Sequence, residues 1–150
     1  MQYSAGIIPY KFVDGDVMFF LGHPGGPMNA KRNYWALLKG SMENGENPLD
    51  TAIREFQEES GITLESGIKE RLWLVGTIKQ VNNKLVTAYA VEVEDIDCEN
   101  CHSNLVQGEN FPEMDKYRWF TIEQVRGVVS KTNLWLYEEI LSKLGINESN

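Results

Sequence analysis

The stretch from Gly40 to Ile62 reads GSMENGENPLDTAIREFQEESGI. It opens with a glycine loop and passes through Asn47-Pro48 into a predicted helix, because asparagine is a favoured N-cap and proline a favoured first helical residue. Gly61 is a typical C-terminal stop. Residues three and four positions apart share one face of a helix. One face of this helix is apolar, with Leu49, Ala52, Ile53 and Phe56, and another carries Glu55, Glu58 and Glu59, with Arg54 beside them.

The carboxylate face needs a physical explanation. Like charges at this spacing destabilise a helix by roughly 0.2–0.5 kcal/mol for each pair. A divalent cation would offset that repulsion. The competing explanation is a solvated helix surface, which is the usual one for an isolated pair of glutamates.

Length and composition indicate an ordinary globular protein. A chain of 150 residues is expected to form one domain over residues 1–150 with a single sizeable core. The net charge of −8 argues against a non-specific nucleic-acid binder, but a bound metal could still recruit a small polyphosphate. No apolar run is long enough to cross a bilayer, and the N-terminus lacks the features of a signal peptide, so a cytoplasmic location is expected.

The order of predicted elements favours an α/β sandwich. The prolines and glycines of His23–Pro27 are expected to end the second strand, Asn82-Asn83 suits a hairpin turn, and residues 94–109 are expected to form a loop. Strands are expected at residues 3–13, 17–21, 34–38, 72–78, 85–93 and 117–120, and helices at 47–60, 121–129 and 134–144.

The central stretch also carries a family resemblance. Gly40, Glu46 and the run from Arg54 to Ile62 (REFQEESGI) have the spacing of the Nudix box, with Phe56 where a smaller aliphatic residue is usual. The sequence therefore resembles a Nudix hydrolase, and the resemblance implies an α+β fold, the Nudix α/β/α sandwich with a mixed central sheet. Further segments resemble a bacterial branch of predicted nucleotide pyrophosphohydrolases: Ser4-Ala5-Gly6, His23–Pro27, Trp35, Lys39-Gly40, Phe111–Asp115 and Trp119-Phe120.

The resemblance implies a reaction and a set of site residues. The reaction is hydrolysis of a P–O–P bond in a nucleoside diphosphate linked to another group, with Mg²⁺ or Mn²⁺ as the cofactor. Glu58 and Glu59 are expected to bind the metal directly, and Glu55 to bind it directly or through water. The backbone carbonyl of Lys39 is a further expected ligand. Arg54 completes the expected catalytic set by orienting a carboxylate, with Glu46 as the candidate for a bidentate pair.

Residues outside the box are expected to complete the site. A carboxylate from Glu113 or Asp115, or less favourably Glu109, would add to the metal cluster, with a solvent-facing acid as the alternative. Lys79 and Lys84 could reach phosphates or could be surface lysines. The aromatic residues could stack on a nucleobase, although most are expected in the core. The substrate-binding residues expected from these considerations are Glu46, Glu113, Trp35 and Lys79.

Several substrates are compatible with the sequence. A diadenosine polyphosphate is the leading candidate, and ADP-ribose, a nucleoside triphosphate and the 5′ end of RNA are alternatives, with the acidic charge counting against long RNA. A non-catalytic nucleotide sensor on the same fold is a different class of function. An isomerase of isopentenyl-type diphosphates is disfavoured because no cysteine precedes the box. A homodimer is one expectation, since homodimers are the commonest oligomers.

Cys98-Glu99-Asn100-Cys101-His102 has the spacing of a c-type haem attachment motif. Haem attachment is disfavoured because the chain shows no sign of export. A zinc site would need a fourth ligand besides the two thiols and His102. Exposed loop residues are therefore the expected interpretation.

Overall fold

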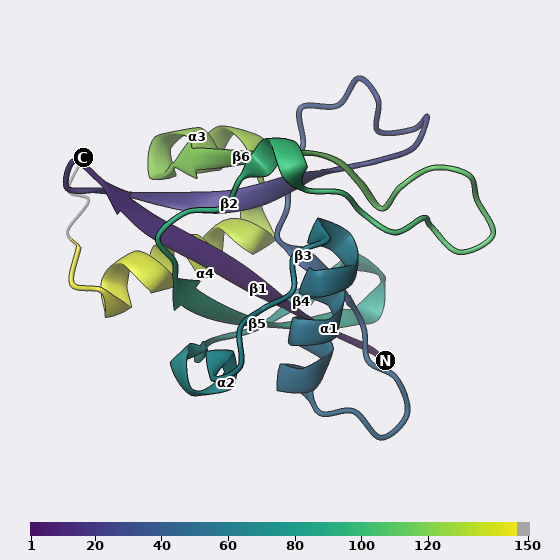
Figure 1. Cartoon of the computed structure of the whole chain (residues 1–150), viewed down its shortest axis with the longest axis horizontal. Coiled ribbons are helices and arrows are strands. Elements are labelled where there is room, and N and C mark those ends of the chain that lie inside the picture. The colour runs from purple at the N-terminus through teal and green to yellow at the C-terminus, as the bar shows by residue number, and fades with distance from the viewer. Residues whose placement is uncertain (147–150) are drawn as a thin grey trace.

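A six-stranded mixed sheet forms the centre of the computed structural model, which describes residues 1–146 (Figure 1). Residues 147–150, part of the expected domain, lie outside the described chain. The strand order is β4-β5-β1-β2-β6, with β3 paired to β1 beside that path. β1 and β5 pair in parallel, and the other pairs are antiparallel. The strands are β1 (Gln2–Val13), β2 (Asp16–Pro24), β3 (Leu38–Ser41), β4 (Trp73–Gln80), β5 (Lys84–Glu92) and β6 (Met114–Thr121).

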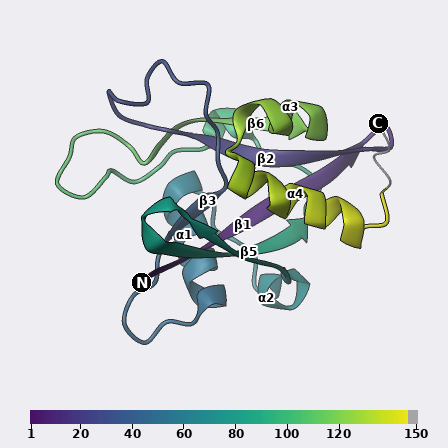
Figure 2. The ribbon, with the colours of Figure 1, turned by 180° about the vertical axis from the view of Figure 1, so that it is seen from behind.

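Helices cover both faces of the sheet. α1 (Pro48–Ser60) and α2 (Ile68–Arg71) lie in front of it in Figure 1, and α4 (Lys131–Lys143) lies in front when the molecule is turned around in Figure 2, with α3 (Ile122–Val128) beside β6. Successive side chains of a strand point to opposite faces. Accordingly, Phe19 belongs to the apolar core under α3 and α4, and Phe20 to the core under α1 and α2. The expected α/β/α sandwich with a mixed central sheet is confirmed.

Helix α1 forms where the caps predicted it. The side chain of Asn47 accepts a hydrogen bond from the Asp50 amide at 2.9 Å, and Pro48 is the first helical residue. At the other end Gly61 has φ 74°, the left-handed conformation that suits glycine, and its N–H donates to Gln57 O. Ala52 and Phe56 are fully buried against the sheet, while Leu49 and Ile53 are partly buried.

Two strand predictions need correction. The expected strand at 34–38 contributes only an isolated bridge between Gly22 and Ala36, and β3 begins at Leu38, so Lys39 and Gly40 lie in a strand and not in a loop. The second strand was expected to stop before His23, but it continues to Pro24. It does so because Gly22 and His23 pair with β6, and the pairing becomes irregular only between His23 and Pro24.

The remaining elements agree with the predictions more closely. Asn82 and Asn83 both have positive φ in the turn between β4 and β5. Thr121 and Gln124 form a reciprocal capping box at the start of α3. α4 begins at Lys131, earlier than expected, because Ser130 caps it. The short helix α2 and a 3₁₀ turn at Cys98–Asn100 were not predicted. No helix within residues 1–146 is both long and apolar enough to cross a membrane.

Candidate active site

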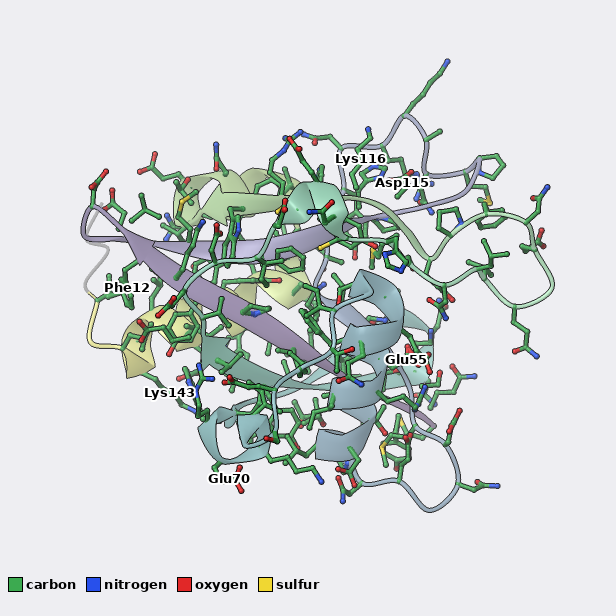
Figure 3. The ribbon with its side chains drawn as sticks, viewed as in Figure 1. Phe12, Glu55, Glu70, Asp115, Lys116 and Lys143 are labelled. Atoms are coloured by element: carbon green, nitrogen blue, oxygen red, sulfur yellow. The ribbon has the colours of Figure 1, made fainter. Side chains whose placement is uncertain are left out.

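A cleft of about 400 Å³ opens between α1, β3 and the loop that precedes β6. Figure 3 labels Glu55, which projects from α1 at its wall. The expected ligands therefore share one cavity with basic side chains. The cleft is lined by Glu43, Glu55, Glu58, Glu59 and Glu113, by Lys39, Arg54 and Lys84, and by Ser4, Gly40, Ser41, Asn104, Leu105 and Gln107.

Glu59 lies at the floor of the cleft and is only 3% exposed. The Lys39 amide donates to its Oε1 at 3.3 Å, and the Tyr117 hydroxyl donates to its backbone carbonyl. Burial, reinforced by the negative charges of Glu55 and Glu113, raises the pKa of Glu59 to about 9. Burial likewise raises the pKa of Glu55. Glu59 is therefore not part of a solvated helix surface, because β3 and β6 pack around it.

Arg54 connects the carboxylates to the preceding loop. Its Nε and Nη2 donate to the two carboxylate oxygens of Glu46 at 2.7 and 3.0 Å, so the predicted bidentate pair is confirmed. Nη1 also donates to Glu55 at 2.8 Å and approaches Glu58 at 3.3 Å. Nη2 further contacts the Ser41 carbonyl at 2.9 Å. One guanidinium thus fixes the entry loop and two metal-ligand candidates.

Glu46 does not line the cleft, which argues against its expected role as a substrate contact. Its carboxylate is occupied by Arg54, by the Glu43 amide at 2.9 Å and by the Thr51 hydroxyl at 2.8 Å. The hydrogen bond from Arg54, followed by that from Glu43, lowers the pKa of Glu46 to about 2. Glu46 therefore anchors the loop.

This anchor predicts a pH-dependent loss of stability. A carboxyl group whose folded pKa is depressed stabilises the protein above its unfolded pKa of 4.5, and this contribution is lost as the pH falls towards about 2. We expect Glu46→Gln to unfold at lower urea concentration than the wild type at neutral pH. The difference between their urea midpoints should shrink below about pH 4.5. A difference that is independent of pH would contradict the ionic character of the anchor.

Lys39 and Gly40 place β3 against the carboxylates. The amide of Lys39 points towards Glu59, and in a strand the N–H and C=O of one residue point to the same edge. The Lys39 carbonyl therefore faces the cleft, as a ligand would, although its binding of metal stays a prediction. A Cβ on Gly40 would lie 2.0 Å from the carboxyl carbon of Glu55, so glycine is needed there for Glu55 to occupy its position.

Some of the other expected residues line the cleft and others lie outside it. Glu113 lines the cleft, whereas Asp115 lies outside it and contacts His23 at 2.7 Å. Trp35 is only 3% exposed and packs in the core under α3 and α4. Lys79 is exposed on β4 and does not line the cleft, so neither residue fits the expected substrate contact in this arrangement. The cleft contains Lys84 instead.

The cysteine motif does not form a metal site. Within residues 1–146, no three His, Cys, Asp or Glu side chains already lie close enough together to hold a metal ion, in this loop or in the cleft, where Arg54 contacts Glu55 and Glu58. Cys98 and Cys101 are half-buried, and burial raises the pKa of Cys101 to about 11. The loop has another role that the sequence did not reveal: the amides of His102 and Asn104 donate to the Ser60 and Glu58 carbonyls at the end of α1.

Comparison with known proteins assigns the family. A NUDIX domain model matches residues 12–143. The RNA pyrophosphohydrolase of Bartonella quintana is 29% identical over 124 residues, which cover 73% of this chain and 69% of that protein. The asymmetrical bis(5′-nucleosyl)-tetraphosphatase of Sus scrofa is 34% identical over 97 residues, or 61% of this chain and 58% of that protein, less than two thirds of its length.

Solved structures give the same assignment of fold. A binary complex of a C. elegans Ap4A hydrolase has a TM-score of 0.73 and 21% identity, and the match covers 97% of this chain and 98% of that one. The NUDIX domain of Shewanella oneidensis NrtR, complexed with ADP ribose, has a TM-score of 0.70 and 12% identity over 95% of this chain and 87% of that one.

The chain belongs to the Nudix family, since the family model spans most of its length. It is a Nudix hydrolase of the pyrophosphohydrolase type, as the sequence resemblance indicated. Nudix hydrolases generally use divalent metal ions and act on nucleotides.

Proposed function

We propose that this Nudix hydrolase uses Mg²⁺, with Mn²⁺ as a substitute, to cleave a P–O–P bond of a nucleotide that carries a polyphosphate chain, with a diadenosine polyphosphate as the leading substrate. The observation that supports the proposal is the presence of acidic and basic side chains in the same cleft. Glu55, Glu58, Glu59 and Glu113 line it together with Lys39 and Lys84. The charge of Lys39 interacts with those of Lys84, Glu59, Glu113 and Glu55. A polyphosphate offers negative oxygens both to metal ions at the carboxylates and to the lysines.

The donor set fits a hard divalent cation. Glu59 is a buried carboxylate beside Glu55 and Glu113, an arrangement that a cation would stabilise. Glu58, Glu59, the Lys39 carbonyl and Glu55 would hold it, with Glu113 completing the set. Glu55 and Glu58 contact Arg54 in this structure, so binding would require them to exchange that contact. The ion would neutralise phosphate charge and acidify a bound water.

The residues of the chain supply the positioning that phosphoryl transfer mainly requires. Arg54 fixes the entry loop and neutralises part of the carboxylate charge, β3 presents the Lys39 carbonyl, and Glu59 is oriented by the Lys39 amide. The two relatives named above are an RNA pyrophosphohydrolase and a bis(5′-nucleosyl)-tetraphosphatase, which supports a polyphosphate chain in the substrate. ADP-ribose, nucleoside triphosphates and 5′-triphosphorylated RNA belong in the same screen.

A turnover screen of nucleotides with Mg²⁺ or Mn²⁺ tests the proposal. We expect release of mononucleotides from diadenosine polyphosphates, faster than from ADP-ribose, when the products are separated by ion-exchange chromatography. Tight nucleotide binding by calorimetry without any product would instead support a sensor. The same preparation in a size-exclusion column would test the expected homodimer.

Glu58→Gln provides the matching test of the metal site. Residues that only support metal ligands already change activity by about 10- to 100-fold, so the loss of a ligand should lower kcat by at least about 100-fold. The fold should survive, because the Glu58 side chain is 40% exposed. Circular dichroism would check the fold, and a rate like that of the wild type would exclude Glu58 as a ligand.

A further inference from the structure

Two long loops leave the same end of the sheet and run beside each other (Figures 1 and 2). The first follows β2 from Gly25, and the second precedes β6 and ends in Phe111–Glu113. The backbone joins them, because the Gly25 amide donates to the Glu113 carbonyl at 2.9 Å. The first loop has the glycine content of a phosphate cradle, yet none of residues 23–33 lines the cleft. Its glycines therefore need another explanation.

The glycines allow a close approach of the two loops. A Cβ on Gly25 would lie 2.2 Å from the carbonyl oxygen of Pro112, and a Cβ on Gly26 would lie 2.6 Å from the ring of Phe111. The backbone of Gly25 does not have a positive φ, so the requirement for glycine at this position is purely steric. Any larger residue at Gly25 must displace the backbone next to Glu113.

His23 fixes the same junction through its side chain. It is 3% exposed, and its Nδ1 lies 2.7 Å from Asp115 Oδ1 while its Nε2 lies 2.7 Å from the Arg32 carbonyl. A backbone carbonyl only accepts hydrogen bonds, so Nε2 carries a proton. Figure 3 labels Asp115 where β6 begins, two residues beyond Glu113. The imidazole thus ties the far part of the first loop to β6.

Glu113 is consequently held from both sides. Its carbonyl accepts from Gly25, its amide donates to the Asn104 carbonyl at 3.0 Å, and the Asn104 amide donates to the Glu58 carbonyl at 2.9 Å. A continuous series of backbone contacts therefore runs from the first loop through Glu113 to the carboxylate helix. We propose that His23 and Gly25 are positioning residues, which hold the Glu113 carboxylate beside Glu59 in the cleft without touching the substrate. This inference rests on the proposed function to the extent that Glu113 acts at the metal site.

Gly25→Ala tests the inference, with Gly127→Ala as the matched control because a Cβ on Gly127 meets no atom within 4 Å. We expect Gly25→Ala to lower kcat about as far as Glu113→Gln does, with little change in KM. The double variant should be no slower than Glu113→Gln alone, since residues acting through one group are not additive. Mn²⁺ affinity, measured by calorimetry without nucleotide, should fall by about 10-fold in both single variants.

Hydrogen–deuterium exchange supplies a readout that is independent of catalysis. Peptides that contain residues 104–113 should exchange faster in Gly25→Ala than in Gly127→Ala or Glu113→Gln. If Gly25→Ala does not fold, Asp115→Ala removes the partner of His23 at a side chain that is 31% exposed, and it should show the same pattern with a smaller loss.

Several results would overturn the inference. These are a wild-type kcat in Gly25→Ala, losses that multiply in the double variant, or wild-type turnover in Glu113→Gln, which would leave nothing to position. A wild-type protein without activity on any nucleotide would instead overturn the proposed substrate class. In that case Mn²⁺ affinity and hydrogen exchange would still decide whether His23 and Gly25 position Glu113.

Discussion

Replacing Glu59 by glutamine is expected to abolish turnover and, in EDTA, to raise the melting temperature by about 5 °C. The first effect follows because Glu59 is an expected metal ligand at the floor of the cleft. The second follows because the Glu59 carboxyl is 3% exposed and lies near the charges of Glu55 and Glu113. Glutamine has a similar shape and can still accept the hydrogen bond from the Lys39 amide, but it carries no charge.

The stability of the protein without metal is expected to depend on pH through the Glu59 carboxyl. The folded pKa of Glu59, about 9, lies above the ordinary value of 4.5, so the folded protein binds a proton that the unfolded chain releases. Stability from this group therefore falls as the pH rises from about 4.5 to about 9. Melting curves in EDTA between these values should show a steeper loss of stability with rising pH in the wild type than in Glu59→Gln.

Glu58→Gln is the matched control, because it makes the same chemical change on a side chain that is 40% exposed. It should lose turnover without gaining stability. Added Mg²⁺ should stabilise the wild type more strongly than Glu59→Gln, since an ion that binds the folded state shifts its unfolding equilibrium. A Glu59→Gln variant that melts at or below the wild-type temperature in EDTA would show that the buried carboxyl is not destabilising.

Gly40→Ala is expected to inactivate the enzyme while leaving its stability nearly unchanged. The added Cβ would lie 2.0 Å from both the carboxyl carbon and Oε2 of Glu55, so that carboxylate must leave its position. The atoms that have to move are at the end of a flexible side chain, and Gly40 does not have a positive φ, so the backbone accepts alanine. A displacement on the order of 1 Å in a positioned group can reduce kcat by about 100-fold.

Three measurements separate this effect from a general disturbance. The melting temperature of Gly40→Ala should stay close to that of the wild type. Its kcat should fall towards that of Glu55→Gln, and combining Gly40→Ala with Glu55→Gln should add little. Retention of wild-type kcat would show that the observed position of Glu55 is not required for catalysis.

Local signals in the sequence were sufficient to predict the helix that carries the site. Asn47, Pro48 and Gly61 each act on their own neighbours, and the helical repeat alone places Phe56 on the buried face. The pairing of Arg54 with Glu46 was implied by the resemblance to the Nudix box, whose residues lie close together in the chain. These features depend mainly on contacts between residues that are close in sequence, so the sequence pattern alone predicts them.

Features that depend on how the strands pair could not be predicted from the sequence in the same way. Glu58 and Glu59 are equivalent in the helical pattern, yet only Glu59 is buried, because β3 and Tyr117 lie against it. Lys84 enters the cleft because the start of β5 pairs with the N-terminus of β1, whereas Lys79 does not line it. Trp35 is buried, as large aromatic residues generally are.

The parallel pairing of β1 with β5 has a consequence for how activity appears during folding. It joins residues 2–10 to residues 84–92, and Glu113 reaches the cleft only once β6 has paired with β2. Contacts between such distant segments form late, because closing a long loop costs chain entropy before the contacts reward it. A nascent chain therefore cannot assemble the cleft until β6 has emerged from the ribosome, and recovery of turnover after dilution from denaturant reports the last stage of folding and not the first.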